Sequence, residues 1–162
     1  MNCRLTNILS ALLITVSFSI VSHSADFTSI EGTYVLKSRQ LANGTTLEQP
    51  VVVGLYKISG GYMSFNLAVK HNDGKIVSRS AIATYTISGS TYKVELLYNA
   101  VNDGTGTKYE FSKNIGSSEM SIYDGKVEMK IPLSDNLYGS FGETSLTVMN
   151  RGKYIDSWVK VN

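Results

Sequence analysis

The sequence predicts an all-β fold, a single antiparallel up-and-down β-barrel, and three observations carry this prediction. Apolar and polar residues alternate with a period of two along most of the chain after residue 25. Glycine-containing turn sequences such as Ser59-Gly60-Gly61 interrupt the alternation at short intervals. No later segment sustains the period of an amphipathic helix. Sequential hairpins need no long crossover, which favours a meander that closes on itself and so protects its edges.

Five strands are expected in the first half of the chain, each bounded by turn residues. Asn43-Gly44 follows the first strand, and Ser59-Gly60-Gly61 connects the second to the third. His71-Asn72-Asp73-Gly74 and Ser88-Gly89-Ser90 bound the fourth, in which the small residues of Ser78–Tyr85 also fit a turn of helix. The expected strands are Ile30–Ser38, Val51–Ile58, Tyr62–Val69, Ile76–Ile87 and Thr91–Tyr98. In the last of these, one face would carry Tyr92, Val94, Leu96 and Tyr98.

Five shorter strands are expected in the second half. The flexible loop Asn102–Gly106 precedes them, and Asp124-Gly125 joins the second to the third, which Pro132 ends. A polar loop that contains glycine is expected over Ser134–Glu143, and Asn150-Arg151-Gly152 turns the closing hairpin. The expected strands are Lys108–Ser112, Glu119–Tyr123, Lys126–Ile131, Ser145–Met149 and Tyr154–Val161.

Residues 1–25 have the pattern of a secretory signal peptide. Arg4 is the only charge, an uncharged apolar run extends from Ile8 to Val21, and the small residues Ser24 and Ala25 follow. The run is too short for a good transmembrane span, so stable membrane insertion is not expected. Cleavage after Ala25 would leave 162 − 25 = 137 residues. We expect these residues, 26–162, to form one domain that is periplasmic or secreted.

Composition argues against several classes of function. Cleavage would remove Cys3 and His23 and leave no thiol and one imidazole, that of His71 in an expected exposed turn. We therefore expect no metal site and no cofactor. Without Arg4, 14 lysines and arginines balance 13 aspartates and glutamates, and the charges are interspersed. A chain without a basic stripe is not expected to bind nucleic acid.

Short motifs follow one another along the chain in the order of a known family. Ile30–Leu36 contains Gly32-Thr33-Tyr34 where that family begins its barrel with Gly-x-Trp, so Tyr34 replaces the usual tryptophan. Gly54-Leu55-Tyr56, Gly61-Tyr62-Met63-Ser64 and Leu146-Thr147-Val148 fall where its later strands would lie. In these motifs the chain resembles bacterial lipocalin-like (calycin-type) domains. The resemblance implies an antiparallel barrel with one open end and a cavity for a small apolar molecule. Some related barrels are isomerases or cyclases, so the fold does not settle the function.

Aromatic side chains are the candidate ligand-binding residues. After residue 25 the chain has ten tyrosines, four of its five phenylalanines, and Trp158. An aromatic wall with a few hydroxyl groups would hold a flat or greasy ligand inside a barrel. Alternatively, the same rings simply fill the interior of a small barrel. The candidates are Tyr56, Phe65, Tyr85, Tyr92 and Phe111.

A second group of residues is expected to close the barrel rather than to bind a ligand. The resemblance implies that an aromatic side chain of the first strand packs at the closed end, near a basic residue from the last strands. Gly32 and Tyr34 come from the first strand, and Arg151 or Lys160 would supply the cation over a ring beside Trp158.

Three functions remain open at this point. The first is binding of a small hydrophobic or amphipathic molecule in the barrel cavity. The second is an isomerase or cyclase, for which Glu95 is a weak catalytic candidate if its side chain faces inward rather than toward solvent. The third is a protein-interaction module with a filled barrel, whose partner would contact loops such as Ser134–Glu143.

Overall fold

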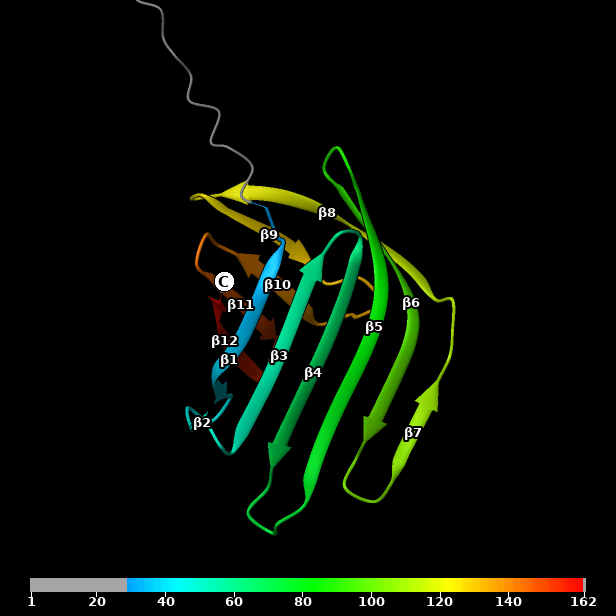
Figure 1. The fold of residues 1–162 in the computed structure, drawn as a ribbon. Helices are drawn as coiled ribbons and strands as arrows, with labels where there is room; N and C mark the ends of the chain where they lie inside the picture. Colours follow the sequence, from blue (N-terminus) through cyan, green and yellow to red (C-terminus); the bar gives the residue numbers. More distant parts are fainter. Residues whose placement is uncertain (1–28, 162) are drawn as a thin grey trace, which may run out of the picture.

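The computed structural model describes residues 29–161, and within this range it contains β-strands and no helix (Figure 1). The predicted signal peptide, residues 1–25, lies outside the described residues. No helix of the described part is long and apolar enough to cross a membrane. The strands are β1 Gly32–Leu41, β2 Thr46–Glu48, β3 Val52–Ser59, β4 Tyr62–Lys70, β5 Ile76–Ser88, β6 Thr91–Asn102, β7 Thr107–Glu110, β8 Ile115–Tyr123, β9 Lys126–Lys130, β10 Leu137–Phe141, β11 Ser145–Asn150 and β12 Tyr154–Val161.

Ten of these strands form a closed barrel. Each pairs antiparallel with the next in the order β1-β3-β4-β5-β6-β8-β9-β10-β11-β12, and β12 pairs back onto β1. β2 and β7 lie outside the ring as partners of β1 and β6. The expected up-and-down barrel is therefore confirmed, and ring closure pairs the first ring strand with the last.

One end of the barrel is filled with side chains. Ile30 precedes β1, is fully buried, and accepts a hydrogen bond at its carbonyl oxygen from the Tyr34 hydroxyl, with an O···O distance of 2.9 Å. The Tyr34 ring packs edge-on against Phe141 and tilted against Tyr56. The remaining buried side chains of this core include Ile58, Tyr85, Tyr92, Met120, Val127 and Leu146. This filled end supplies the apolar burial that stabilises the fold.

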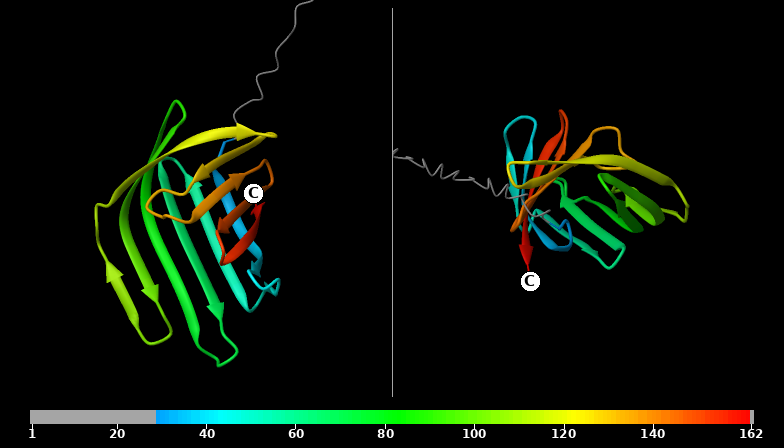
Figure 2. Two further views of the ribbon diagram at one scale, coloured as in Figure 1. Left: turned by 180° about the vertical axis from the view of Figure 1, so that it is seen from behind. Right: turned by 90° about the horizontal axis from the view of Figure 1, so that it is seen from above.

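The other end is wider because β6 changes partner along its length. Residues 91–95 of β6 pair with β8, whereas residues 99–102 pair with β7, which leads away from the ring. Figure 2 shows β3 to β7 as a curved sheet that extends beyond the strands β9 to β12. The two walls therefore separate toward the end at which β5 begins.

Two β-bulges change which residues face the interior at this wide end. In β1 the register shifts between Leu36 and Ser38, so that Arg39 and not Ser38 faces inward opposite Asp156. The Leu36 carbonyl oxygen beside this bulge accepts a hydrogen bond of 2.9 Å from the Gln49 side chain. In β6 the register to β5 shifts beyond Leu96. A bulge adds one residue and so exchanges the two faces of the strand that follows it.

Three sequence expectations are corrected by the structure. The expected loop Ser134–Glu143 contains β10, whose residues Leu137, Gly139 and Phe141 face the interior. A Cβ at Gly139 would lie 2.9 Å from Ile131 Cδ1 and 3.0 Å from Phe141 Cε2, so the glycine leaves room for these two side chains. Tyr98 is not on the face of Tyr92 and Val94, because the β6 bulge turns it outward against Phe111, with 5.3 Å between ring centroids. Ser78–Tyr85 is strand throughout and not a helical turn.

Candidate functional site

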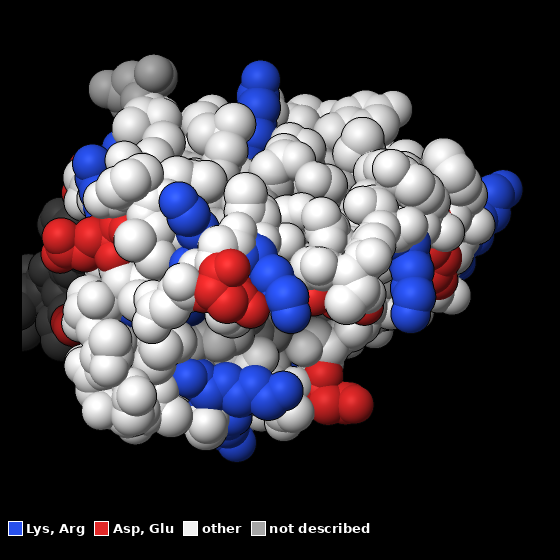
Figure 3. Space-filling view, turned by 90° about the horizontal axis from the view of Figure 1, so that it is seen from below, with Lys and Arg blue, Asp and Glu red and all other residues white. Residues whose placement is uncertain are grey.

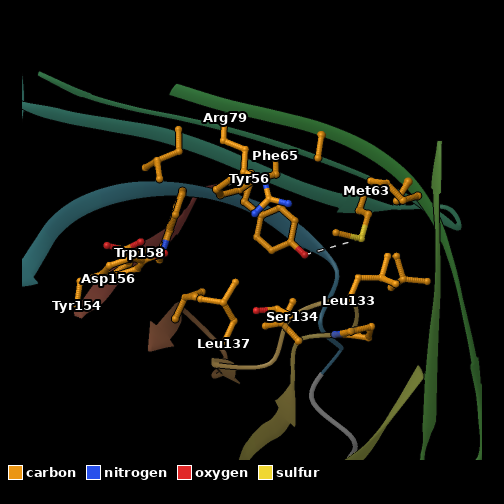
Figure 4. Close-up of a pocket in the computed structure, with 18 residues that line it drawn as sticks. Tyr56, Met63, Phe65, Arg79, Leu133, Ser134, Leu137, Tyr154, Asp156 and Trp158 are labelled. Atoms are coloured by element: carbon orange, nitrogen blue, oxygen red, sulfur yellow. Dashed lines mark hydrogen bonds between the residues drawn. The ribbon is translucent and has the colours of Figure 1, made fainter. Parts of the chain in front are cut away.

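A cavity of about 210 Å³ lies inside the wide half of the barrel. Its walls come from β3 to β6 on one side and from β11, β12 and the connection between β9 and β10 on the other. Figure 4 shows Tyr56, Phe65 and Met63 on one wall and the segment that carries Leu133 and Ser134 across from them. The apolar lining consists of Met63, Phe65, Leu67, Ala81, Ala83, Val94, Leu96, Ile131, Pro132, Leu133, Leu137, Val148 and Trp158. Such a lining favours a molecule with an apolar body.

Leu133 shows how the connection between β9 and β10 forms a wall. Its backbone has a φ of 62°, in the left-handed region that non-glycine residues rarely adopt. The segment reaches Gly116 at the start of β8, where a Cβ would lie 2.9 Å from the Leu133 amide nitrogen. Gly116 therefore allows the connection to pack closely beside β6 and β8, where the barrel begins to widen.

A buried ion pair borders the cavity. The Arg39 guanidinium donates two hydrogen bonds of 2.7 Å to the two carboxylate oxygens of Asp156, from Nε to Oδ1 and from Nη2 to Oδ2. Both side chains are buried, and the Tyr154 ring lies 3.7 Å from the guanidinium carbon. Burial acts to lower the pKa of Arg39, but the bonds to Asp156 more than offset this and the net shift is upward. The Asp156 carboxylate is thus neutralised by its own partner.

A second arginine lines the cavity without an acidic partner among the described residues. Arg79 comes from β5 and donates a hydrogen bond of 3.1 Å from Nε to Asn99 Oδ1 on β6. Asn99 faces Arg79 because the β6 bulge places it, and not Tyr98, on the inner face. No salt bridge of the described residues includes Arg79. Its charge is therefore free to act on whatever enters the cavity.

The Trp158 indole adds an unpaired hydrogen-bond donor. Trp158 lines the cavity with 2% of its surface exposed, and its Nε1 has no hydrogen-bond partner in the described structure. Its ring lies 6.1 Å from Phe65 and 6.5 Å from Tyr56, between centroids. Buried donors without a partner are rare in proteins, so this group needs an explanation.

The five aromatic residues predicted to bind a ligand lie in three places. Tyr56 and Phe65 line the cavity, with their rings edge-to-face and 5.8 Å apart. Tyr85 and Tyr92 face inward but belong to the filled end, and their rings are 5.8 Å apart. Phe111 does not line the cavity: it follows β7 and is 81% exposed on the outer surface. The structure thus brings two of the five together at the cavity.

The inward-facing tyrosines are held neutral by burial. Burial raises the pKa of Tyr85 to about 12, and it raises those of Tyr56 and Tyr92 further. The hydroxyl groups of Tyr56 and Tyr92 both point to the Met63 sulfur, at 3.9 and 3.4 Å. The Tyr85 hydroxyl donates a short hydrogen bond to Glu31. These tyrosines present apolar rings and neutral hydroxyls to the interior, not charges.

The predicted catalytic candidate, Glu95, does not line the cavity. Val94 and Leu96 line it, so strand alternation directs the Glu95 side chain to the outer face of β6. His71 is exposed in the turn between β4 and β5, as expected. No group of three or more histidine, cysteine, aspartate or glutamate side chains with metal-binding geometry occurs within residues 29–161.

The four residues expected to close the barrel do not form one cluster. Lys160 on β12 lies over the Tyr34 ring, with Nζ 5.9 Å from the centroid. A Cβ at Gly32 would collide with the Lys160 side chain, so the glycine leaves room for it. Arg151 instead stacks on Tyr138, at 4.1 Å. The Trp158 ring contacts the Tyr56 ring, which in turn contacts the Tyr34 ring.

Sequence reasoning missed the polar residues of the cavity. Arg39 and Asn99 were not predicted to face inward, because a strict period of two places Ser38 and Tyr98 there instead. Arg79 and Asp156 follow the alternation of their own strands but were not singled out, because charged side chains are mostly exposed. One signal was present in the sequence. Asp156 alternates with Tyr154 and Trp158, so a carboxylate on the face of the single tryptophan indicates a buried cationic partner.

Comparison with known proteins yields one structural likeness. No family model matches the sequence, and no curated protein matches it. The crystal structure of a lipocalin-like protein from Bacteroides uniformis ATCC 8492 is similar over 82% of this chain and 98% of that chain, with a TM-score of 0.38 and 15% sequence identity. That protein is of the class that the motifs of this sequence resemble. At this level of similarity the likeness assigns neither a ligand nor an activity to the chain.

Proposed function

We propose that this barrel binds a small hydrophobic or amphipathic molecule in the cavity of its wide half. The single observation that carries the proposal is the cavity itself, about 210 Å³ of space with mainly apolar walls inside a closed barrel. An unfilled interior leaves side chains without packing partners, which destabilises a protein unless a ligand occupies the space. A filled barrel, as expected for a pure interaction module, would not contain this space.

The size of the cavity limits the ligand. An apolar cavity of about 150 Å³ holds benzene. A cavity of about 210 Å³ that opens toward the wide end therefore suits one ring with a short substituent, or a chain of about eight carbons. Tyr56, Phe65 and Trp158 offer ring faces to such a body, whose burial contributes about 25 cal/mol per Å² before the costs of association.

We propose further that the barrel acts outside the cytoplasm, in the periplasm or in the medium. This location is supported by the apolar run from Ile8 to Val21 and by the small residues that follow it up to Ala25. Expression of the full chain in a bacterial host, followed by N-terminal sequencing of protein from each compartment, tests it. Protein that retains Met1 and stays in the cytoplasm would refute it.

Titration with a series of straight-chain alcohols from butanol to decanol tests the cavity. Trp158 is the single tryptophan and lines the cavity, so its fluorescence reports occupancy. Each buried methylene contributes about 0.8 kcal/mol, so the affinity should rise about threefold to fourfold per carbon and level off once the chain fills the cavity. An affinity that does not depend on chain length would refute cavity binding.

Two substitutions on one strand provide the matched control. Ala81 lines the cavity and the next residue, Ile82, faces outward and is exposed. Ala81→Phe should fill the cavity and weaken binding at least about tenfold, whereas Ile82→Phe should leave it unchanged. Thermal unfolding of each variant verifies the fold. If folded Ala81→Phe binds as tightly as the natural protein, the ligand site lies elsewhere.

A further inference from the structure

We propose that the polar end of the ligand is an anion of the carboxylate class, and that Arg79 binds it at the mouth of the cavity. This inference rests on the proposed function, since it specifies which amphipathic molecules the cavity takes. It follows from the position of one arginine, from the hydrogen bonds that it leaves unmade, and from the charge balance of the cavity wall.

Arg79 is placed where the head group of a seated ligand would lie. It is the fourth residue of β5, so it lies near the wide end of the barrel, and it pairs across the sheet with Leu67 and Val101. Its side chain lines the cavity and is exposed to solvent at the same time. Figure 4 shows it on the same wall as Phe65 and Tyr56. A ligand whose apolar body contacts these rings has its polar end within reach of the guanidinium.

Most hydrogen-bond donors of Arg79 have no acceptor among the described residues. A guanidinium carries five N–H groups, and the described structure uses one, the Nε–H that is donated to Asn99 Oδ1. That bond ties the guanidinium to β6, and the two terminal amino groups have no protein acceptor among the described residues. Two parallel N–H groups of a fixed guanidinium match the two oxygens of a carboxylate.

The charge balance of the cavity also favours an anion. Asp156 is the only acidic residue of the described lining, and both of its oxygens are already bonded to Arg39. The described cavity wall therefore carries one uncompensated positive charge, that of Arg79. Figure 3, which views the molecule from below, shows charged side chains of both signs dispersed among neutral ones. On this face, therefore, the charge of Arg79 is not part of a broad basic patch.

The sign of the charge on Arg79 also separates classes of polar head group. A ligand with acceptor oxygens complements the Arg79 amino groups, whereas an ammonium ligand would bring further donors and meet the positive charge of Arg79. The Trp158 Nε1 does not take part, because that atom is enclosed by protein and does not face the cavity.

Three probes that share an eight-carbon chain test the inference: octanoate, 1-octanol and octylamine. Calorimetric titration should give octanoate an affinity about tenfold or more above that of octanol, and octylamine the weakest binding of the three. Arg79→Gln should weaken octanoate binding about tenfold or more and change octanol binding less than about twofold. Arg79→Lys keeps the charge but loses the planar pair of N–H groups, so its affinity for octanoate should lie between those of the natural protein and Arg79→Gln. Lys57→Gln, on the exposed outer face of β3, removes an equal charge and should change nothing.

The results separate this inference from the proposed function. If octanol binds and Ala81→Phe abolishes that binding, but octanoate binds no better than octanol, the cavity is real and the anion assignment is wrong. Equal weakening of both probes by Arg79→Gln would also overturn it, because the arginine would then act only through packing. If none of the three probes binds, or if Ala81→Phe leaves their binding intact, the proposed cavity function itself fails and the inference fails with it.

Discussion

The buried ion pair between Arg39 and Asp156 permits a quantitative prediction of stability. Asp156→Asn keeps the shape of the side chain but removes its charge, and it leaves a buried guanidinium with at most one good acceptor. The pair makes two charge-assisted hydrogen bonds of 2.7 Å. Each contributes about 1.5–3 kcal/mol, and removal of one partner of a buried pair costs about 3–5 kcal/mol. We therefore expect the free energy of unfolding to fall by about 3–5 kcal/mol.

Such a loss is a large share of the stability of a domain of this size. Native domains are stable by about 5–15 kcal/mol, so the variant should unfold at a temperature about 10–20 °C lower. Urea unfolding followed by Trp158 fluorescence and by far-ultraviolet circular dichroism measures the change. The slope of the free energy with urea should stay the same, which would show that the folded state is intact.

Two further variants test whether the loss of stability comes from the buried pair or would follow the removal of any carboxylate. Asp73→Asn breaks the exposed pair with Lys75, which spans 3.5 Å, and should cost less than about 1 kcal/mol. The double variant Arg39→Met/Asp156→Leu removes both buried charges and should regain most of the stability that either single change loses. If Asp156→Asn costs no more than Asp73→Asn, the pair is solvated in the folded protein and the reasoning is refuted.

Three more predictions each concern a single residue. Gly54→Ala should destabilise the fold by about 1–3 kcal/mol in thermal unfolding, because the new Cβ would lie 2.7 Å from the buried Trp158 ring, whereas Gly106→Ala, with nothing within 4 Å, should be neutral. Burial raises the pKa of Tyr34 to about 12 from the ordinary 10, so the unfolded state loses its proton first as pH rises. The contribution of Tyr34 to the free energy of unfolding, about 2–3 kcal/mol, should therefore be complete below pH 10 and be lost between about pH 10 and 12. Urea titrations at a series of pH values measure this loss, and Tyr34→Phe should make it smaller. Iodide should quench Trp158 fluorescence weakly in the folded protein and strongly in urea, because 2% of the side chain is exposed.

The barrel itself could be predicted because its signals are local. Alternation in Tyr62–Val69 and Thr91–Tyr98 reports one buried face, and the glycine turns report hairpins, so the meander follows from short stretches of sequence. β10 was not predicted, because the contacts that make it a strand are not local in the sequence. Its central Gly139 carries no apolar side chain, and its fit depends on Ile131 and Phe141, which only the folded barrel brings beside it.

The candidate site could be predicted only in part. Tyr56 and Phe65 lie on β3 and β4, whose pairing has no register shift, so simple alternation places them inward correctly. Arg39 and Asn99 lie beyond bulges, and the sequence gives no local sign of an inserted residue. Phe111 was expected on a strand of the ring, but β7 leaves the ring as a side ribbon, so its ring lies on the outer surface.

The two bulges and the change of partner along β6 act at the same end of the barrel, and together they account for the site. When β6 leaves β8 for β7, the walls separate and space opens that the side chains of a regular small barrel would fill. The connection that contains Leu133 closes part of the resulting gap from the side. At the same level the bulges bring the polar side chains Arg39 and Asn99 to the inner face, where each meets a partner across the sheet, Asp156 and Arg79. The filled end tolerates no such irregularity, because its stability depends on close apolar packing. The cavity and the polar side chains beside it therefore lie at the end at which regular strand pairing stops.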